Sequence, residues 1–397
     1  MWSCFSYASA LSNPFNHAKD EPLTTVVGVI GGGQLARMMV PPAINLGLEI
    51  RVLAENEDSS AQIAATAVGD YTDVETVLSF ADGCDVITFD HEHVPAHVLA
   101  ELIKRGYSVQ PGPHALEFAQ DKLRMRERLG ELGIPVPGWA HASTAERVTD
   151  FLAEWGGRAV AKTARGGYDG KGVRVITSAT EVSDWLGLLQ PGESLLLEEF
   201  VEFRRELSQL IARRPSGEMA LWPVVESIQA DGVCSEVIAP APHSQGKIAD
   251  MAGSIASQIA AELQVTGVMA VELFETTDDR ILVNELAMRP HNSGHWTQDG
   301  STTSQFEQHL RAVLDLPLGA TGLTSPFTVM VNILGGPASG DMLSPFPRAM
   351  ADHPTVKIHT YGKQPRPGRK VGHVNASGDD LPEVAYQARG AAGFFQV

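Results

Sequence analysis

The sequence predicts a multidomain chain that is α/β at its N-terminal end and α+β beyond it. Its 397 residues exceed what one hydrophobic core usually serves. Over residues 25–120, short apolar runs alternate with helical patterns, which is typical of a doubly wound parallel sheet. Later apolar runs flank polar or glycine-rich turns, which favours pairs of neighbouring strands. We therefore expect two or three domains.

The N-terminal region supplies the parallel sheet. Strands are predicted at Thr25–Ile30, Glu49–Ala54 and Val86–Phe89, and a helix begins at Leu35. The breaker cluster Gln110–Pro113 marks the end of this region. We expect residues 25–120 to form one domain, preceded by a disordered extension over residues 1–24.

The remainder of the chain is predicted to contain one long helix and several strands. The helix covers Ala115–Leu132 and is rich in Lys, Arg and Glu. The predicted strands are Arg158–Lys162, Val173–Ile176, Leu195–Phe200, Val268–Phe274 and Ile281–Ala287. We expect residues 121–315 to form a domain of two subdomains that divide near residue 190. Residues 316–397 are expected to form a small C-terminal domain.

Charge and cysteine content restrict the function. The formal net charge is −18, which argues against a nucleic-acid partner, because phosphate backbones are bound by basic surfaces. Three widely spaced cysteines suggest neither a disulfide framework nor a metal site, and they fit the reducing cytoplasm. No apolar run is long enough to span a membrane. An anionic small substrate would need a local basic cluster, and Lys363–Lys370 is the densest one.

The first glycine turn, Gly31–Ala36, matches the dinucleotide fingerprint in its G-x-G-x-x-A form. It follows a strand, opens a helix and is followed by Glu55 after the next strand. Such a turn lets a phosphate approach amides at a helix N-terminus. The same turn also occurs where a helix merely packs closely on a sheet, so by itself it leaves both interpretations open.

A second glycine loop, Gly166–Gly172, lies between two predicted strands. It is not a Walker loop, because no Ser or Thr follows Lys171 and a strand follows instead of a helix. A glycine-rich hairpin can fold over a triphosphate as a flap, its amides donating to phosphate oxygens. Lys162, at the end of the preceding strand, favours the flap over a flexible surface hairpin, because an inward lysine needs an anionic partner.

Two glutamates interrupt apolar strands farther along the chain. If the strands form a hairpin that turns at Asp278–Asp279, Glu272 and Glu285 lie opposite each other. Their repulsion would be about 4 kcal/mol at ~4 Å and an effective dielectric constant of ~20. Either one carboxyl group is protonated or a cation such as Mg²⁺ lies between them; a pair facing solvent is the alternative. The segment Arg289–Trp296 follows and concentrates hydrogen-bonding side chains, for binding or for fixing a turn.

Together these features resemble the N5-carboxyaminoimidazole ribonucleotide synthase family of the ATP-grasp superfamily. The similarity runs from about Val26 to the C-terminus. The family commonly has Gly at Ala36, Glu at Asp90 and Pro at Met288, so this chain departs there. The most specific strings are GGGQLARMM (31–39), KTARGGYDGKG (162–172), NELAMRPHNSGHWT (284–297), SQFEQHLR (304–311) and YGKQPRPGRKVGHV (361–374).

The resemblance implies an ATP-grasp fold with an N-terminal doubly wound parallel-sheet (pre-ATP-grasp) domain and a small C-terminal domain. It also implies a cytoplasmic homodimeric ligase that joins bicarbonate to 5-aminoimidazole ribonucleotide through carboxyphosphate, with ATP as co-substrate and Mg²⁺ as cofactor. Implied ATP-binding residues are Lys122, Lys162, Gly167, Gly170, Gly172, Glu198, Glu199, Phe200, Val201, Glu206 and Asn284, and Glu272 and Glu285 would hold the metal.

The remaining implied residues act on the other substrates. Those expected near bicarbonate or the reacting amine are Arg289, His291, Asn292, Tyr168 and Asp169; those expected to bind the ribonucleotide are Gln34, Leu35, Glu92, Lys363, Arg369 and Lys370.

The sequence leaves three other functions open. One is another ATP-grasp ligase, such as a formate-using ribotide transformylase or a biotin carboxylase. The second is a dinucleotide-dependent oxidoreductase built on the Gly31 turn, and the third a non-catalytic nucleotide-binding regulator. The oxidoreductase leaves Glu272 and Glu285 unexplained, and the regulator leaves Arg289–His295 unexplained.

Overall fold

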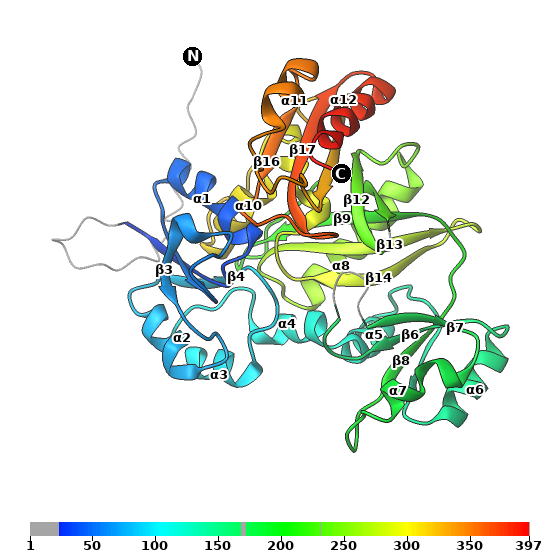
Figure 1. Ribbon diagram of the computed structural model, residues 1–397. Coiled ribbons are helices and arrows are strands. Elements are labelled where there is room, and N and C mark those ends of the chain that lie inside the picture. The colour runs from blue at the N-terminus through cyan, green and yellow to red at the C-terminus, as the bar shows by residue number, and fades with distance from the viewer. Residues whose placement is uncertain (1–23, 168–171, 231, 397) are drawn as a thin grey trace, which may run out of the picture.

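The computed structural model describes residues 24–167, 172–230 and 232–396. The N-terminal sheet and the small sheet of β5–β8 lie on opposite sides of the molecule, and α4 and α5 run between them (Figure 1). The last strands extend the central sheet, and the last helices pack against that end of it (Figure 1). The predicted extension over residues 1–24 lies almost entirely outside the described residues.

The N-terminal sheet is parallel, with strand order β3-β2-β1-β4, as predicted. Every residue of β1 and β4 is buried, because helices cover both faces of the sheet. Its elements are β1 (Val26–Ile30), α1 (Gln34–Leu46), β2 (Glu49–Ala54), η1 (Gln62–Ala64), β3 (Ala65–Val68), α2 (Val74–Ala81), β4 (Val86–Phe89) and α3 (Ala96–Lys104).

The single helix predicted over Ala115–Leu132 is wrong. The chain forms α4 (Pro113–Gln120) and α5 (Lys122–Glu131), which are separated at Asp121. Asp121 has extended backbone angles, and its carboxylate accepts hydrogen bonds from the first amides of α5. The Lys122 amide instead donates to the carbonyl of Ala164, at 2.8 Å. The break therefore brings Lys122 beside the second glycine loop.

A four-stranded antiparallel sheet of order β5-β8-β6-β7 carries that loop. The β6–β7 hairpin predicted from the sequence is confirmed, with Lys162 opposite Val173. This unit contains β5 (Trp139–Ala142), α6 (Ala145–Glu154), β6 (Ala159–Thr163), β7 (Val173–Ile176), η2 (Ala179–Val182), α7 (Ser183–Leu186) and β8 (Leu195–Glu199).

The largest sheet has the order β14-β13-β9-β11-β12-β15-β17-β16, with β10 paired to β9. Its last three strands come from the predicted C-terminal domain, so that region continues the central sheet. The strands are β9 (Phe203–Arg213), β10 (Met219–Leu221), β11 (Val225–Ala230), β12 (Val233–Ala239), β13 (Gly267–Thr276), β14 (Ile281–Ala287), β15 (Phe327–Leu334), β16 (Lys357–Thr360) and β17 (Lys370–Gly378). The helices are α8 (Lys247–Glu262), η3 (Asn292–Gly294), α9 (Thr297–Gly300), α10 (Gln305–Val313), α11 (Phe346–Asp352) and α12 (Leu381–Gly393). Within the described ranges, no helix is both long and apolar enough to cross a bilayer.

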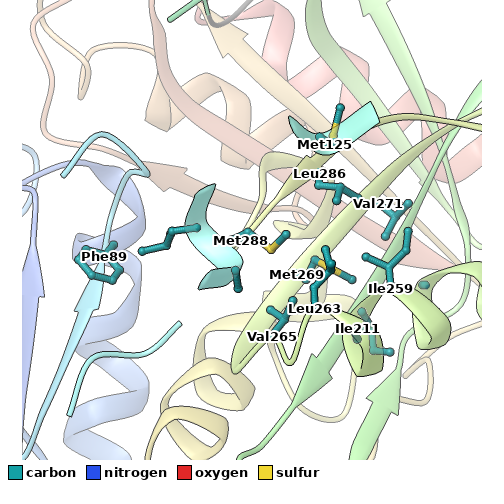
Figure 2. Packing of buried hydrophobic residues seen from close by; sticks show 14 of the residues in the cluster. Phe89, Met125, Ile211, Ile259, Leu263, Val265, Met269, Val271, Leu286 and Met288 are labelled. Carbon is teal, nitrogen blue, oxygen red and sulfur yellow. The ribbon is translucent and has the colours of Figure 1, made fainter. Parts of the chain in front are cut away.

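One buried cluster joins the N-terminal sheet to the central sheet. It contains Phe89 at the end of β4, Met125 of α5 and Met269 of β13. Figure 2 shows Met288 lying between Phe89 and this group. Because Met288 directly precedes Arg289, this packing holds the end of β14 against the N-terminal domain.

Candidate active site

A cavity of about 910 Å³ brings together most of the predicted site residues. They come from the N-terminal domain, the small sheet and the central sheet. Those lining it are Glu92, Lys122, Lys162, Gly167, Glu198, Glu199, Phe200, Val201, Glu206, Glu272, Asn284, Glu285, Arg289, His291, Asn292 and Lys370. Gln34, Leu35, Gly172, Lys363 and Arg369 do not line it. Tyr168, Asp169 and Gly170 lie outside the described residues.

The two glutamates are opposed as predicted, since Glu272 of β13 pairs with Glu285 of β14. Burial, followed by the charges of Glu285 and Glu206, raises the pKa of Glu272. Two neighbours face this pair: the Lys122 ammonium lies 3.2 Å from Glu285, and His291 Nε2 lies 3.4 Å from Glu272. The pair lines the cavity, where the Glu272 and Glu285 side chains remain 27% and 41% exposed, so the carboxyl groups face the cavity interior and not the outer surface of the hairpin.

Lys162 reaches into the cavity and already has an anionic partner. Its Nζ lies 2.7 Å from Glu198 and donates to Asn284 Oδ1 at 3.0 Å. Arg126 contacts the other oxygen of Glu198, and both side chains are almost fully buried. Burial alone would raise the pKa of Glu198, but the charges of Arg126 and Lys162 lower it to about 2. Glu198 is therefore an ionised carboxylate that orients Lys162.

The described ends of the second glycine loop have backbone conformations that glycine favours. Gly166, Gly167 and Gly172 have φ values of 68°, 79° and 73°. A Cβ atom at Gly172 would lie 2.5 Å from the Thr163 hydroxyl, and the Gly172 carbonyl accepts from the Thr163 amide. The loop therefore has no room for a side chain at Gly172, where it rejoins β7, whereas Gly166 faces open space.

The segment after β8 lines the same cavity from the other side. Glu199 turns its carboxylate away, accepting from the Gly138 amide at 3.1 Å. The Arg158 guanidinium lies over the Phe200 ring, 3.5 Å from its centroid. Glu206 on β9 is half-buried, and burial raises its pKa. An apolar lining from Phe200 and Val201 beside a single carboxylate suits a flat heterocycle attached to a sugar.

Arg289 is held by Glu92 from the N-terminal domain. Its Nε donates to Glu92 at 2.8 Å, and the other Glu92 oxygen accepts from the Met288 amide at 2.8 Å. A proline at position 288 would lack that N–H group, so this departure from the family pattern adds a hydrogen bond. Glu92 thereby fixes the guanidinium at the edge of the cavity.

His291 is a neutral imidazole with a defined proton position. Its Nδ1 accepts from the Ser293 amide, so the Ser293 hydroxyl, at 2.8 Å, must also be donating to it. Ser208 in turn contacts the Ser293 hydroxyl at 2.7 Å. The ring proton therefore resides on Nε2, the nitrogen that faces Glu272. Burial, then the charges of Arg289 and Lys370, lower the pKa of His291 to about 3.

Asn292 presents an unused amide next to His291. Both its Oδ1 and Nδ2 are buried, and neither meets hydrogen-bond geometry with a partner among the described residues. The amide does lie near the Cys234 thiol, where it opposes the rise in pKa that burial causes. The side chain lines the cavity and is 8% exposed. Buried polar atoms are normally paired, so this amide is suited to a ligand that both accepts and donates hydrogen bonds.

The first glycine turn is filled by carboxylates of the chain itself. The Asp90 carboxylate accepts from the Ala36 amide at the start of α1, and a Cβ atom at Gly33 would lie 1.9 Å from it. Glu55 likewise accepts from the Gly32 amide at 3.0 Å. These carboxyl groups occupy the Gly32 and Ala36 amides, two of those that a dinucleotide pyrophosphate would need, which argues against the oxidoreductase.

Of the other predicted ribonucleotide residues, Gln34, Leu35 and Lys363 lie at this turn, and Arg369 contacts its own loop. The Lys363 ammonium donates to the Gln34 side chain, which links the C-terminal region to α1. The Leu35 side chain is buried in the domain core, so only its backbone can reach a ligand. Arg369 donates to the carbonyl of Gln364 in its own loop, at 3.1 Å.

Four residues of this site were missed by sequence reasoning. Arg126, Ser208, Ser293 and Gln305 are each almost fully buried. Arg126 contacts Glu198, Ser293 and Gln305 contact His291, and Ser208 acts through Ser293. Arg126 lies in a helix full of charges, and the two serines look like ordinary strand and turn residues. Ser293 lies in the polar segment Arg289–Trp296 that the sequence singled out, whereas the family-like string was the only signal for Gln305.

Sequence profiles of known families match three consecutive parts of the chain. The ribonucleotide synthetase preATP-grasp domain matches residues 24–120, and the ATP-grasp domain matches residues 127–306. The C-terminal domain of phosphoribosylaminoimidazole carboxylase matches residues 328–387. Together with the cavity, these matches define an ATP-dependent ligase with the ATP-grasp fold, which confirms the predicted fold class.

Curated relatives identify the family within this class of ATP-dependent ligases. N5-carboxyaminoimidazole ribonucleotide synthase of Corynebacterium ammoniagenes is 50% identical over 392 residues, covering 96% of this chain and 94% of the relative. The Mycobacterium tuberculosis H37Rv enzyme of the same name is 48% identical, covering 93% and 87%. The chain belongs to the N5-carboxyaminoimidazole ribonucleotide synthase family. It is a ligase of purine biosynthesis that carboxylates 5-aminoimidazole ribonucleotide with the use of ATP.

Solved structures agree with this assignment. An ADP complex of N5-carboxyaminoimidazole ribonucleotide synthetase has a TM-score of 0.84 at 35% identity, covering 92% of this chain and 96% of the other. The Aspergillus clavatus enzyme in complex with ADP and 5-aminoimidazole ribonucleotide has a TM-score of 0.83 at 31% identity, covering 94% and 98%.

Proposed function

We propose that this chain uses bicarbonate as its carboxyl source and proceeds through carboxyphosphate. A bicarbonate oxygen attacks the γ-phosphorus of ATP, and ADP leaves. The ribonucleotide amine then attacks the carboxyl carbon, phosphate leaves and the amine loses a proton. The observation that carries this proposal is the placement of Lys122, Lys162 and the Glu272–Glu285 pair in one cavity with Arg289. Phosphate-binding and anion-binding groups are thus within reach of one another.

Mg²⁺ is the metal that we propose for the Glu272–Glu285 pair. Two opposed carboxylates, one with a raised pKa, are a donor set that a hard cation would relieve. Among the described residues, no group of three or more His, Cys, Asp or Glu side chains could hold a metal alone, which fits a site completed by nucleotide phosphates. Bound there, Mg²⁺ would neutralise phosphate charge during phosphoryl transfer.

Lys122 and Lys162 are proposed to bind the ATP phosphates. Lys122 is now paired with Glu285, so we expect it to turn towards phosphate once a metal neutralises that carboxylate. Lys162 is kept in place by Glu198 and Asn284. The other proposed nucleotide contacts are Gly167, Gly170 and Gly172 of the flap, Glu199, Phe200 and Val201 for adenine, and Glu206 for the ribose hydroxyl groups.

Arg289, His291 and Asn292 are proposed to bind bicarbonate and then carboxyphosphate. The guanidinium offers paired donors to an oxyanion, and Glu92 prevents it from turning away. The His291 Nε2–H group and the unpartnered Asn292 amide add further donors. In this proposal His291 donates a hydrogen bond and does not remove a proton through Nε2.

The ribonucleotide is proposed to lie between the cavity and the first glycine turn. Lys370 lines the cavity, and Lys363 lies beside Gln34 at the start of α1. In this position the phosphate of the ribonucleotide would lie near the Leu35 amide. Arg369, Glu92, Tyr168 and Asp169 complete the proposed set. We also propose a division into three domains, a cytoplasmic location and a homodimer. The proposed domains are residues 25–120, 121–315 and 316–397.

The decisive measurement is ADP release with Mg-ATP and bicarbonate, with and without freshly made 5-aminoimidazole ribonucleotide. Strong stimulation by the ribonucleotide, together with a labile carboxylated product, would support the proposal. If the protein binds ATP but is not stimulated, another ATP-grasp ligase or the non-catalytic regulator becomes the better assignment.

Lys363→Ala tests the ribonucleotide site. It should raise the KM for the ribonucleotide with little effect on the KM for ATP. An equal rise in KM for both substrates would refute the role of Lys363.

A further inference from the structure

The side-chain amide of Gln305 holds the main chain of His291 at both ends. Gln305 Oε1 accepts from the His291 N–H at 2.8 Å, and Gln305 Nε2 donates to the His291 carbonyl at 2.8 Å. The second hydrogen of Nε2 is used by His295 Nδ1, at 3.0 Å. Gln305 lies at the first position of α10 and is fully buried. It does not line the cavity, so it acts on the site only through its neighbours.

The surrounding loop is built to admit this amide. A Cβ atom at Gly294 would lie 2.3 Å from Gln305 Oε1, so a side chain there would push the amide away. The Gln305 main-chain amide donates to the Thr297 hydroxyl at 2.9 Å, which fixes the start of α10 against the same loop. The position of the His291 backbone is therefore set by a residue 14 positions along the chain.

Backbone position is what the His291 ring still needs. The hydroxyls of Ser208 and Ser293 and the Ser293 amide decide which ring nitrogen carries the proton. Ser208 also ties the turn to β9 through the Ser293 hydroxyl, but none of these groups bonds to the main chain of His291. Gln305, on α10, holds the His291 N–H and carbonyl groups directly.

We propose that Gln305 is a positioning residue for the carboxylation reaction, holding His291 so that its Nε2–H group faces the carboxylate pair. This inference rests on the bicarbonate-binding role proposed for His291. Removing the clamp leaves the His291 N–H and carbonyl groups without their partners and lets the turn shift. A shift of about 1 Å at a binding group can lower a rate about 100-fold.

Gln308 provides a matched control one turn farther along α10. Its amide clamps Gly319 in the same manner, with Nε2 donating to the Gly319 carbonyl at 2.8 Å and Oε1 accepting from its N–H at 2.7 Å. Gln308 is also fully buried, and neither residue lines the cavity. Gln305→Met and Gln308→Met therefore each remove a two-bond clamp on a main chain from the same helix, and only the first clamp holds His291. Gln305→Met also removes the bond to His295.

The test is a double-mutant cycle on steady-state ADP release with the ribonucleotide present, varying bicarbonate in CO₂-depleted buffer. We expect Gln305→Met to lower kcat/KM for bicarbonate about 10- to 100-fold, with the KM for ATP changed less than about twofold. In a His291→Ala background the same substitution should cost less than about threefold, because the clamped ring is gone. Gln308→Met should leave the kinetics near wild type in both backgrounds.

A second variant guards against misfolding. Gln305→Glu keeps an acceptor for the His291 N–H group, so it should retain more activity than Gln305→Met. The proposal is overturned if Gln305→Met matches Gln308→Met, or if its loss is as large in the His291→Ala background. If His291→Ala leaves kcat/KM for bicarbonate unchanged, the role proposed for His291 is refuted. If His291→Ala lowers kcat/KM but Gln305→Met does not, the role of His291 stands and the positioning role of Gln305 is refuted.

Discussion

Glu198 and Glu272 line the same cavity, but the chain neutralises only the first of them. Glu198 lies between Arg126 and Lys162, and its pKa is lowered to about 2. Glu272 faces Glu285 and a neutral His291, and its pKa is raised. Lys122 lies 3.2 Å from Glu285, so one ammonium group serves two carboxyl groups. The difference separates a structural carboxylate, whose counter-charges are built in, from a carboxylate pair that needs a cation from outside. The second kind marks the place where Mg-nucleotide is expected.

Glu198→Gln should produce the largest effect on stability. It leaves the buried Arg126 and Lys162 facing each other without their anion, and breaking such a buried group usually costs about 3–5 kcal/mol. Urea unfolding followed by circular dichroism measures this free energy. A loss below about 1 kcal/mol would show that solvent compensates the charges of Arg126 and Lys162. Glu198 would then not be a structural carboxylate of the kind described.

The pH dependence of stability sharpens the same point. The folded-state pKa of Glu198 is about 2 against an ordinary value of 4.5, so its stabilisation is fully present above pH 4.5 and is lost as pH falls towards 2. This shift corresponds to about 3 kcal/mol. The difference in unfolding free energy between wild type and Glu198→Gln should therefore shrink over that range. A difference independent of pH would contradict the assignment.

Glu272→Gln should do the reverse, sparing stability and removing activity. It abolishes the repulsion with Glu285, so the melting temperature should be unchanged or higher. ADP release should fall about 100-fold or more, as expected for a group that holds a catalytic metal. Glu285→Gln is the companion variant. A clear drop in melting temperature for both Glu272→Gln and Glu285→Gln would mean that the pair stabilises the fold. That result would contradict the difference drawn between Glu198 and Glu272.

Ligand-dependent stabilisation gives the smallest and most specific effect. At about ten times Kd, ADP with Mg²⁺ should stabilise the wild-type protein by about 1.4 kcal/mol. Excess chelator should remove most of this gain, and Glu272→Gln should show little of it even without chelator. Differential scanning fluorimetry checks all three conditions. An equal gain with and without metal would place the nucleotide on the lysines alone.

Local patterns predicted much of the fold and the central pair of the site. The two strands around a polar turn predicted that Glu272 and Glu285 are opposed, and the structure confirms it. The register next to the turn alone would place Asn284 opposite Glu272, and a bulge between Glu272 and Leu273 brings Glu285 there instead. The glycine hairpin between β6 and β7 was equally local. The helix predicted through Asp121 failed because that residue can also cap a new helix, and contacts with Ala164 and Arg165 favour the break.

What the sequence by itself determined is the alternation of strands and helices, the glycine loops and the identity of the chemical groups. Only the tertiary structure decided which charges are compensated and which amides are held. Arg126 meets Glu198 across 72 positions, Ser208 meets Ser293 across 85, and Lys363 meets Gln34 across 329. The physical reason is that propensity and periodicity act between near neighbours in the chain. Electrostatic compensation and hydrogen-bond satisfaction depend on distance in space, which the packing of the domains sets.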